Sequence, residues 1–238
     1  MHKKLSLGIA ILLCMQGAVA QEEKTWTGEG EFGVNQTTGN TEYQNIIGKL
    51  AFTYTPTETW KHGLKLEALR TEDEERVTGE SYELNLRSDY NLLEKGFLFG
   101  AFRYEDDKFS GYDYQSKLSF GYGQKFIDTK PRFLEVRAGG GVKQSQLENS
   151  DESELEAILD LGLTFRQKVS SNSEFTQEFS VEIGDENIHS ESNTGFLVNI
   201  GESNMALKLS LDIKNNTEVP PDTEKTDTVT AVTLMYSF

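Results

Sequence analysis

The chain has little cysteine, little proline and few basic residues. It contains one cysteine, Cys14, and four prolines in 238 residues. After residue 20 no stretch approaches the roughly 18 consecutive apolar residues that a membrane-spanning helix needs, which excludes a helical membrane protein. Only 23 Lys and Arg stand against 39 Asp and Glu, for a net charge of −16. This acid excess argues against nucleic-acid binding, which requires clustered Lys and Arg.

Glycine and aromatic residues are plentiful instead. The 21 Gly, 14 Phe and 9 Tyr residues, together with the scarcity of proline, indicate an all-β protein. The length suits one large domain or two small ones.

The first twenty residues have the three parts of a secretory signal peptide. A short basic start precedes the apolar residues 5–13, and Ala18-Val19-Ala20 forms a small-x-small cleavage site. Cys14 lies inside this segment, so the rest of the chain has no cysteine although export would allow disulfides. We expect residues 1–20 to be removed and residues 21–238 to form one exported domain.

Apolar and polar residues alternate along most of residues 21–238. This period of two is typical of strands with one apolar and one polar face. The pattern predicts twelve strands, with apolar faces over residues 26–34, 46–54, 60–68, 82–92, 98–104, 112–122, 134–142, 155–165, 175–183, 196–200, 205–213 and 230–238.

The predicted connections alternate in length. The short ones cover residues 55–59, 93–96, 127–131, 170–172 and 201–204, and the longer, acidic ones cover residues 71–78, 145–153, 185–193 and 215–225. Short turns on one rim, long loops on the other and an even strand number are the plan of an outer-membrane β-barrel. We therefore predict an antiparallel transmembrane β-barrel with short periplasmic turns and longer acidic extracellular loops.

The alternation by itself fits a soluble sandwich as well as a membrane barrel. Strand length and the position of the aromatic residues favour the barrel. The predicted strands are long enough for a tilted membrane crossing, and aromatic residues at strand ends are typical of interfacial girdles. The short-turn girdle would consist of Trp26, Tyr54, Trp60, Tyr90, Tyr236 and Phe238. The alternating Leu234, Tyr236 and Phe238 also resemble the C-terminal signal that the barrel assembly machinery recognises.

Four segments carry a family resemblance: Thr38-Gly39-Asn40-Thr41, Trp60, residues 102–112 (FRYEDDKFSGY) and Gly121-Tyr122-Gly123. In this order and spacing the chain resembles the family of salt-induced outer-membrane proteins over almost all of residues 21–238. The resemblance implies an outer-membrane barrel of a Gram-negative bacterium, with osmotic regulation. It implies no catalytic residues and no binding site.

Charged residues on the polar faces of neighbouring strands form the main candidate site. In a barrel they would pair across the lumen, where they either fill it or leave a narrow water-filled opening. Reversing the charge of Arg103 would then alter ion selectivity. We expect this lumen charge ladder to contain Lys65, Glu83, Arg87, Asp89, Arg103, Lys117, Glu135 and Arg137.

Enzyme and metal motifs are weak. Residues 28–33 match G-x-G-x-x-G but lie inside a predicted strand with no helix after them, so a dinucleotide site is not expected. The two histidines after residue 20, His62 and His189, have no neighbouring nucleophile motif, which ranks a lipid hydrolase low. The acidic clusters lack EF-hand spacing and are typical of a solvated rim. We expect no catalytic residues, no metal and no cofactor.

The residues leave two functions open. The first is a porin-like barrel that passes small solutes or ions, or supports the envelope under osmotic stress. The second is a non-conducting barrel whose acidic loops bind a surface partner or divalent cations. In both, the expected partners are outer-membrane lipids and lipopolysaccharide, and the protein is expected to be a monomer.

Overall fold

The computed structural model describes residues 25–37, 43–73, 76–147, 153–220 and 223–238. The expected signal peptide, residues 1–20, lies outside the described residues. None of the described residues forms a helix that could cross a membrane. Regular structure in the described part consists of twelve strands: β1 (Trp26–Thr37), β2 (Tyr43–Tyr54), β3 (Trp60–Asp73), β4 (Arg76–Asn91), β5 (Gly96–Asp107), β6 (Tyr112–Asp128), β7 (Arg132–Leu147), β8 (Ser153–Lys168), β9 (Ser173–Ile183), β10 (Ile188–Asn199), β11 (Met205–Asn216) and β12 (Thr226–Ser237).

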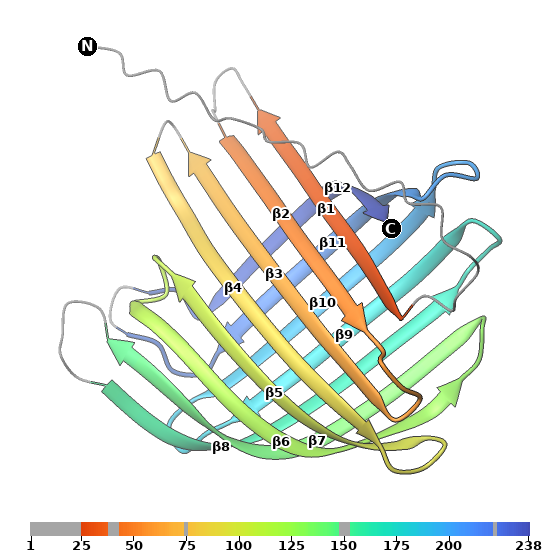
Figure 1. Cartoon of the computed structure of the whole chain (residues 1–238). Coiled ribbons are helices and arrows are strands. Elements are labelled where there is room, and N and C mark those ends of the chain that lie inside the picture. The colour runs from red at the N-terminus through yellow and green to blue at the C-terminus, as the bar shows by residue number, and fades with distance from the viewer. Residues whose placement is uncertain (1–24, 38–42, 74–75, 148–152, 221–222) are drawn as a thin grey trace.

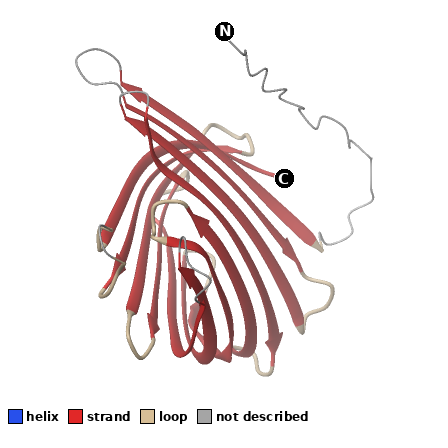
Figure 2. Ribbon diagram, turned by 90° about the vertical axis from the view of Figure 1, so that its left-hand side faces the viewer, coloured by secondary structure: helices blue, strands red, loops and turns tan. Residues whose placement is uncertain are grey.

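The strands form one closed antiparallel barrel. Each strand pairs with its neighbours in sequence, and β1 pairs with β12 to close the wall (Figure 1). Figure 2 shows the strands as a single curved wall around an interior. The start of β1 and the end of β12 lie on the same rim, which we call the terminal rim; the opposite one is the far rim. The predicted fold class and strand number are confirmed.

The far-rim connections are shorter than the sequence pattern predicts. β3 continues to Asp73 and β4 begins at Arg76, so most of the predicted loop over residues 71–78 is strand. β10 begins at Ile188, within the predicted loop over residues 185–193, and the predicted short tenth strand is 12 residues long. Strand pairing depends on backbone hydrogen bonds, which continue where the side chains are polar on both faces. Loss of the apolar face therefore marks the edge of the apolar band, not the end of the strand.

The apolar face of the wall points outward. Phe32, Phe120 and Leu209 keep 60%, 61% and 53% of their surface exposed, whereas Ser119 and Asp160 on the inner face keep 0% and 1%. This is the reverse of a soluble sandwich, which buries its apolar face, and it matches a barrel that faces lipid outside and a polar lumen inside.

One part of the inner wall is aromatic. Phe97 and Phe99 on β5 point inward and keep only 1% and 3% of their surface exposed. Glycines on the adjoining strands leave room for their rings: a Cβ on Gly123 would lie 2.0 Å from Phe97, and one on Gly139 would lie 2.9 Å from Phe99. The sequence pattern does not predict these two phenylalanines, because the alternation places position 98 and its even-numbered neighbours on the apolar face.

The closing seam between β1 and β12 has a short ladder. Its register pairs run from Glu29↔Ser237 to Phe32↔Leu234, and backbone hydrogen bonds between Gly28 and Phe238 extend it at the terminal rim. β1 pairs with β2 along its full length up to Thr37. The described far half of β1 therefore has a ladder partner on one side only.

Candidate functional site: the charged lumen

The lumen contains two cavities on the side of the terminal rim. One has a volume of about 400 Å³ and reaches the turn at Ser170 and Ser171; the other has a volume of about 320 Å³. Both are lined by Lys65 and Glu178, whose side chains form a 2.9 Å ion pair across the barrel from β3 to β9. This pair is half-exposed, which indicates that the surrounding lumen holds water.

Toward the far rim, charged side chains from opposite walls meet around Arg103. Its Nη2 atom lies 2.9 Å from Glu83, 3.0 Å from Glu105 and 2.5 Å from Glu191 on β10. Its Nη1 atom lies 3.7 Å from Glu182 on β9. A guanidinium group has five donors in a planar fork, and it can therefore serve several carboxylates at once.

Two lysines complete this arrangement. Lys117 on β6 pairs with Glu182 at 2.5 Å and with Asp160 at 3.5 Å. Lys214 on β11 pairs with Glu83 at 3.4 Å and also with Glu105. The contacts tie β4, β5 and β6 to β9, β10 and β11 across the lumen. We call the following residues the salt-bridge layer: Glu83, Arg103, Glu105, Lys117, Glu182, Glu191 and Lys214.

The salt-bridge layer is well shielded from solvent. Arg103 and Glu105 are each 8% exposed, Lys117 is 9% exposed and Glu182 is 4% exposed. A cavity of about 10 Å³ lies beside Arg103, Lys117 and Glu182, and the cavity of about 320 Å³ reaches the layer from the terminal side. His189 closes one side by hydrogen bonding to Glu191 at 3.0 Å and to Asn216 at 2.9 Å. The layer therefore fills much of the lumen at this depth.

The residues of the predicted charge ladder fall into several groups. Glu83, Arg103 and Lys117 belong to the salt-bridge layer. Arg87 bonds to Asp89 at 2.7 Å and to Glu135 at 2.8 Å, and its guanidinium lies over the rings of Phe97 and Phe99. Lys65 pairs across the barrel with Glu178. Arg137 makes no ion pair with a described residue. The eight residues thus line one lumen without forming one continuous ladder.

Sequence reasoning leaves several members of the layer out of the ladder. Glu105, which follows the predicted apolar face over residues 98–104, lies inside β5, and Glu191 and His189, which fall in the predicted loop over residues 185–193, lie inside β10. Glu105 is two residues from Arg103 and therefore on the same strand face, which is a signal that could have found it. Glu191 pairs across the lumen with Arg103, and Lys214 pairs across it with Glu105. Such contacts depend on the barrel's diameter and register, which a local pattern does not contain.

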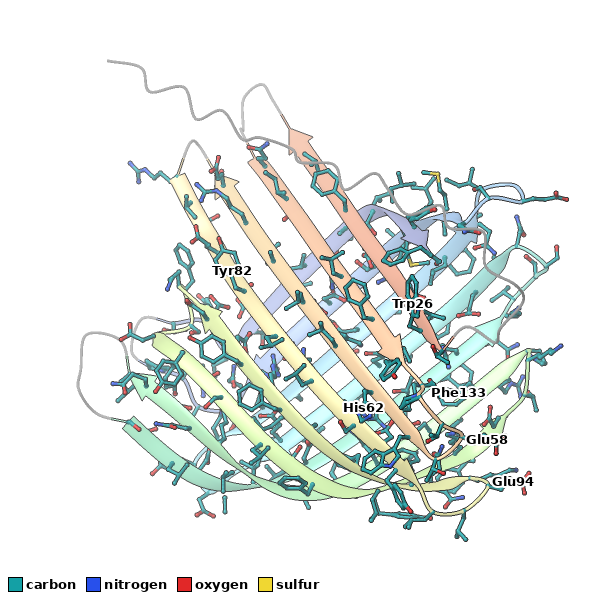
Figure 3. All side chains as sticks on the ribbon, viewed as in Figure 1. Trp26, Glu58, His62, Tyr82, Glu94 and Phe133 are labelled. Carbon is teal, nitrogen blue, oxygen red and sulfur yellow. The ribbon has the colours of Figure 1, made fainter. Side chains whose placement is uncertain are left out.

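The predicted girdle residues lie on the outer face near the terminal rim. Trp26, Tyr54 and Tyr236 keep 53%, 51% and 49% of their surface exposed. The ring of Phe238 lies 6.2 Å from that of Trp26 and 6.1 Å from that of Tyr236. Trp60 and Tyr90 form an edge-to-face pair at 4.9 Å. Figure 3 labels Trp26 on β1 and Tyr82 on β4, which lies closer to the far rim.

The outer face also carries a histidine–serine pair. His62 stacks on Trp60 at 5.6 Å, and its Nδ1 atom lies 2.8 Å from the Ser88 hydroxyl (Figure 3). The other ring nitrogen has no hydrogen-bond partner among the described residues. A nucleophile–base pair needs a third group that orients the base. Instead, the hydrogen bond between His62 and Ser88 gives each of these two polar groups a partner on a lipid-facing wall.

Some carboxylates of the acidic clusters at the far rim already bond to neighbouring groups. Asp106 pairs with Lys108 at 2.7 Å, and this hydrogen bond raises the pKa of Lys108 in the far-rim connection. Asp107 accepts a hydrogen bond from the backbone N–H of Phe109 at 2.9 Å. No group of three or more His, Cys, Asp or Glu side chains among the described residues is placed to hold a metal ion. Glu74, Glu75, Asp151 and Glu152 lie outside the described part of the chain.

An outward apolar face, an inward charged face and a closed even-numbered wall define a bacterial outer-membrane β-barrel. The chain belongs to the family described as "Protein of unknown function, DUF481", whose model matches residues 30–238. The uncharacterized protein YdiY of Escherichia coli (strain K12) is 27% identical over 220 residues, which cover 92% of this chain and 85% of that protein.

Solved outer-membrane barrels share the fold. An outer-membrane channel from Pseudomonas putida F1 has a TM-score of 0.53 at 10% identity, covering 90% of this chain and 94% of that one. The NanC porin has a TM-score of 0.52 at 8% identity, covering 89% of this chain and 97% of that one. At these identities the likeness concerns the architecture of the wall and not the solute.

Proposed function

We propose that the protein is a narrow outer-membrane channel for small solutes or ions. The observation that carries this proposal is the combination of two polar lumen cavities with a salt-bridge layer that restricts, at one depth, the passage between them and the far rim. Rings of charged side chains at a constriction select ions in membrane pores. The fold shared with a channel and a porin supports the same function.

The proposed setting is the outer membrane, with the terminal rim in the periplasm. The longest connection, residues 217–225 between β11 and β12, lies at the far rim and supports this orientation, since the longer loops face outward in barrels of this class. Trp26, Tyr54 and Trp60 would sit at the lipid headgroups there. We further propose export by the signal peptide, assembly guided by Leu234, Tyr236 and Phe238, contact with lipids and lipopolysaccharide, and a monomeric state.

Single-channel recording tests the proposed channel. The purified protein, after heat-modifiable migration on a gel shows that it is folded, is inserted into a planar bilayer. We expect discrete conductance steps that grow with salt concentration. A folded and inserted protein that produces no steps would contradict the channel.

The depth of burial in the salt-bridge layer favours a second function, a non-conducting barrel. Glu182 and Glu105 are 4% and 8% exposed, and in this second function the layer would seal the lumen completely. The far-rim connections would then carry the function by binding a surface partner or divalent cations. Deleting residues 148–152 would then change such binding, and the folded protein would show no conductance in a planar bilayer either before or after the deletion. A channel would conduct in both forms.

A role under osmotic stress is also part of the proposal. It rests on the resemblance to salt-induced outer-membrane proteins and on the restricted lumen. We expect a strain that lacks the gene to grow more slowly than its parent in high salt, and to recover with the intact gene. Equal growth of the two strains in high salt would contradict a role under osmotic stress.

A further inference from the structure

Among the basic side chains that line the lumen cavity of about 320 Å³, three form no ion pair with a described residue. Lys61, Arg137 and Arg166 have no carboxylate within 4.0 Å among the described residues. Several other lumen cations are matched, as in the pairs Lys49–Glu67 at 3.0 Å and Lys208–Glu31 at 2.9 Å. In a protein with a net charge of −16, unmatched cations gathered in one place require a physical explanation.

The three cations line the same cavity of about 320 Å³ on the terminal side of the lumen. They come from β3, β7 and β8, and Lys61 lies within electrostatic range of Arg166. The acids near Lys61 are Asp89 and Glu135, and both are already bonded to Arg87. Seven carboxylates line the same cavity, and each forms an ion pair with a cation other than these three, so Lys61, Arg137 and Arg166 keep N–H donors for a bound solute.

The wall holds the two arginines in defined positions. The guanidinium of Arg166 lies 4.6 Å from the centre of the Phe133 ring, a cation–π contact that leaves its N–H groups free. Arg137 lies against Gly162, where an added Cβ would come within 2.4 Å of its Cζ atom. The register pairs Arg137 with Gly162 and Phe133 with Arg166, so the two arginines stand at different depths on one face of β7 and β8.

We propose that this cavity is a binding site for small oxyanionic solutes, that is, molecules carrying a carboxylate or phosphate group. An anion entering at the terminal rim would meet Lys61 and Arg166 first and Arg137 deeper in the lumen. Arg is suited to this task because its planar fork bonds carboxylate and phosphate oxygens in pairs. Thr164, Ser180 and Asn193 line the same cavity and supply neutral hydrogen-bonding groups. This inference rests on the proposed function, because small oxyanions would be the solutes that the proposed channel passes.

Isothermal titration calorimetry of the purified protein in detergent, at low ionic strength, tests the site. The probes are inorganic phosphate and glucuronate, which distinguish a phosphate site from a carboxylate site. We expect the wild type to bind one or both, and Arg137→Gln and Arg166→Gln each to weaken binding about tenfold, since each removes a charge-assisted hydrogen-bonding group. Arg132→Gln is the matched control: Arg132 is also on β7, but it is exposed and bonds to Gln167 instead of lining the cavity.

A glycine variant separates position from charge. Gly162→Ala keeps every charge but displaces the guanidinium of Arg137, so we expect weaker binding with the fold retained. Absence of binding by the wild type would overturn the proposal, as would an equal loss in the Arg132→Gln control. The measurement needs no conduction: a protein that binds phosphate but forms no pore would overturn the channel and leave the anion site standing.

Discussion

At the residue scale, Arg103 is the centre of the lumen's charge arrangement. Its guanidinium bonds to Glu83, Glu105 and Glu191, which are themselves shielded from water. Without it these carboxylates would face one another with only Lys214 to neutralise them. Removing one partner of a buried ion pair costs far more than the intact pair contributes, because it leaves buried charge unmatched.

We therefore expect Arg103→Gln to lower the free energy of unfolding by about 3–5 kcal/mol. Arg103→Lys keeps the charge but loses the planar set of guanidinium donors, so its free energy of unfolding should lie between those of Arg103→Gln and the wild type. Denaturant unfolding followed by tryptophan fluorescence measures the effect. Arg132→Gln, at an exposed site, should change stability by less than about 0.5 kcal/mol. Equal stabilities of Arg103→Gln and this control would contradict the assigned role.

At the element scale, the wall of β5, β6 and β7 depends on matched large and small residues. Phe97 and Phe99 occupy space that Gly123 and Gly139 leave on the adjoining strands. The sequence predicts these strands from their alternation, but it does not reveal the two inward aromatics. Their signal is the glycines at alternate positions of β6 and β7. These become informative only with the register, which pairs Gly123 of β6 with Phe97 and places Gly139 of β7 one strand further from Phe99.

Gly123→Ala should destabilise the barrel by about 1–3 kcal/mol, because the new methyl group would overlap the Phe97 ring. Combining it with Phe97→Leu should restore part of the loss. Gly48→Ala on β2 is the control, since a Cβ there meets nothing within 4 Å. The measurement is the temperature at which the heat-modifiable gel shift occurs. A Gly123→Ala protein that matches the control would show that the close packing is not required.

The seam between β1 and β12 should be the least stable part of the wall. Beyond Phe32↔Leu234 the described strands show no further register pair. At this end of the ladder Glu31 accepts a hydrogen bond from Thr233 of β12 at 2.7 Å and pairs with Lys208 of β11 at 2.9 Å. We expect amides of β12 that face β1 in residues 229–233 to exchange hydrogen faster than amides of β6 and β7. Glu31→Gln should increase this difference. Uniform exchange around the barrel would contradict a weak seam.

At the scale of the whole molecule, the sequence predicts the class of fold well and the site only in part. The alternation of apolar and polar residues over twelve segments is enough to predict the barrel, since it identifies each strand and its two faces. The pattern places Arg87 and Glu135 in one ladder, and the two side chains do bond. Contacts such as Arg103 with Glu191 join strands that are far apart in sequence, and they follow from the closure of the wall rather than from any local pattern.

If the salt-bridge layer narrows the lumen, removal of one of its ion pairs should widen the passage. Lys117→Ala with Glu182→Ala deletes both partners of a 2.5 Å pair. Asp160 loses its 3.5 Å contact with Lys117 and keeps the hydrogen bond that the Ser119 hydroxyl donates at 2.7 Å. The control is Arg70→Ala with Glu80→Ala, an exposed 2.9 Å pair between β3 and β4 outside the layer. We predict that single-channel conductance in a planar bilayer rises about twofold or more in the layer variant and stays at the wild-type value in the control. Unchanged conductance in a folded layer variant would contradict the account.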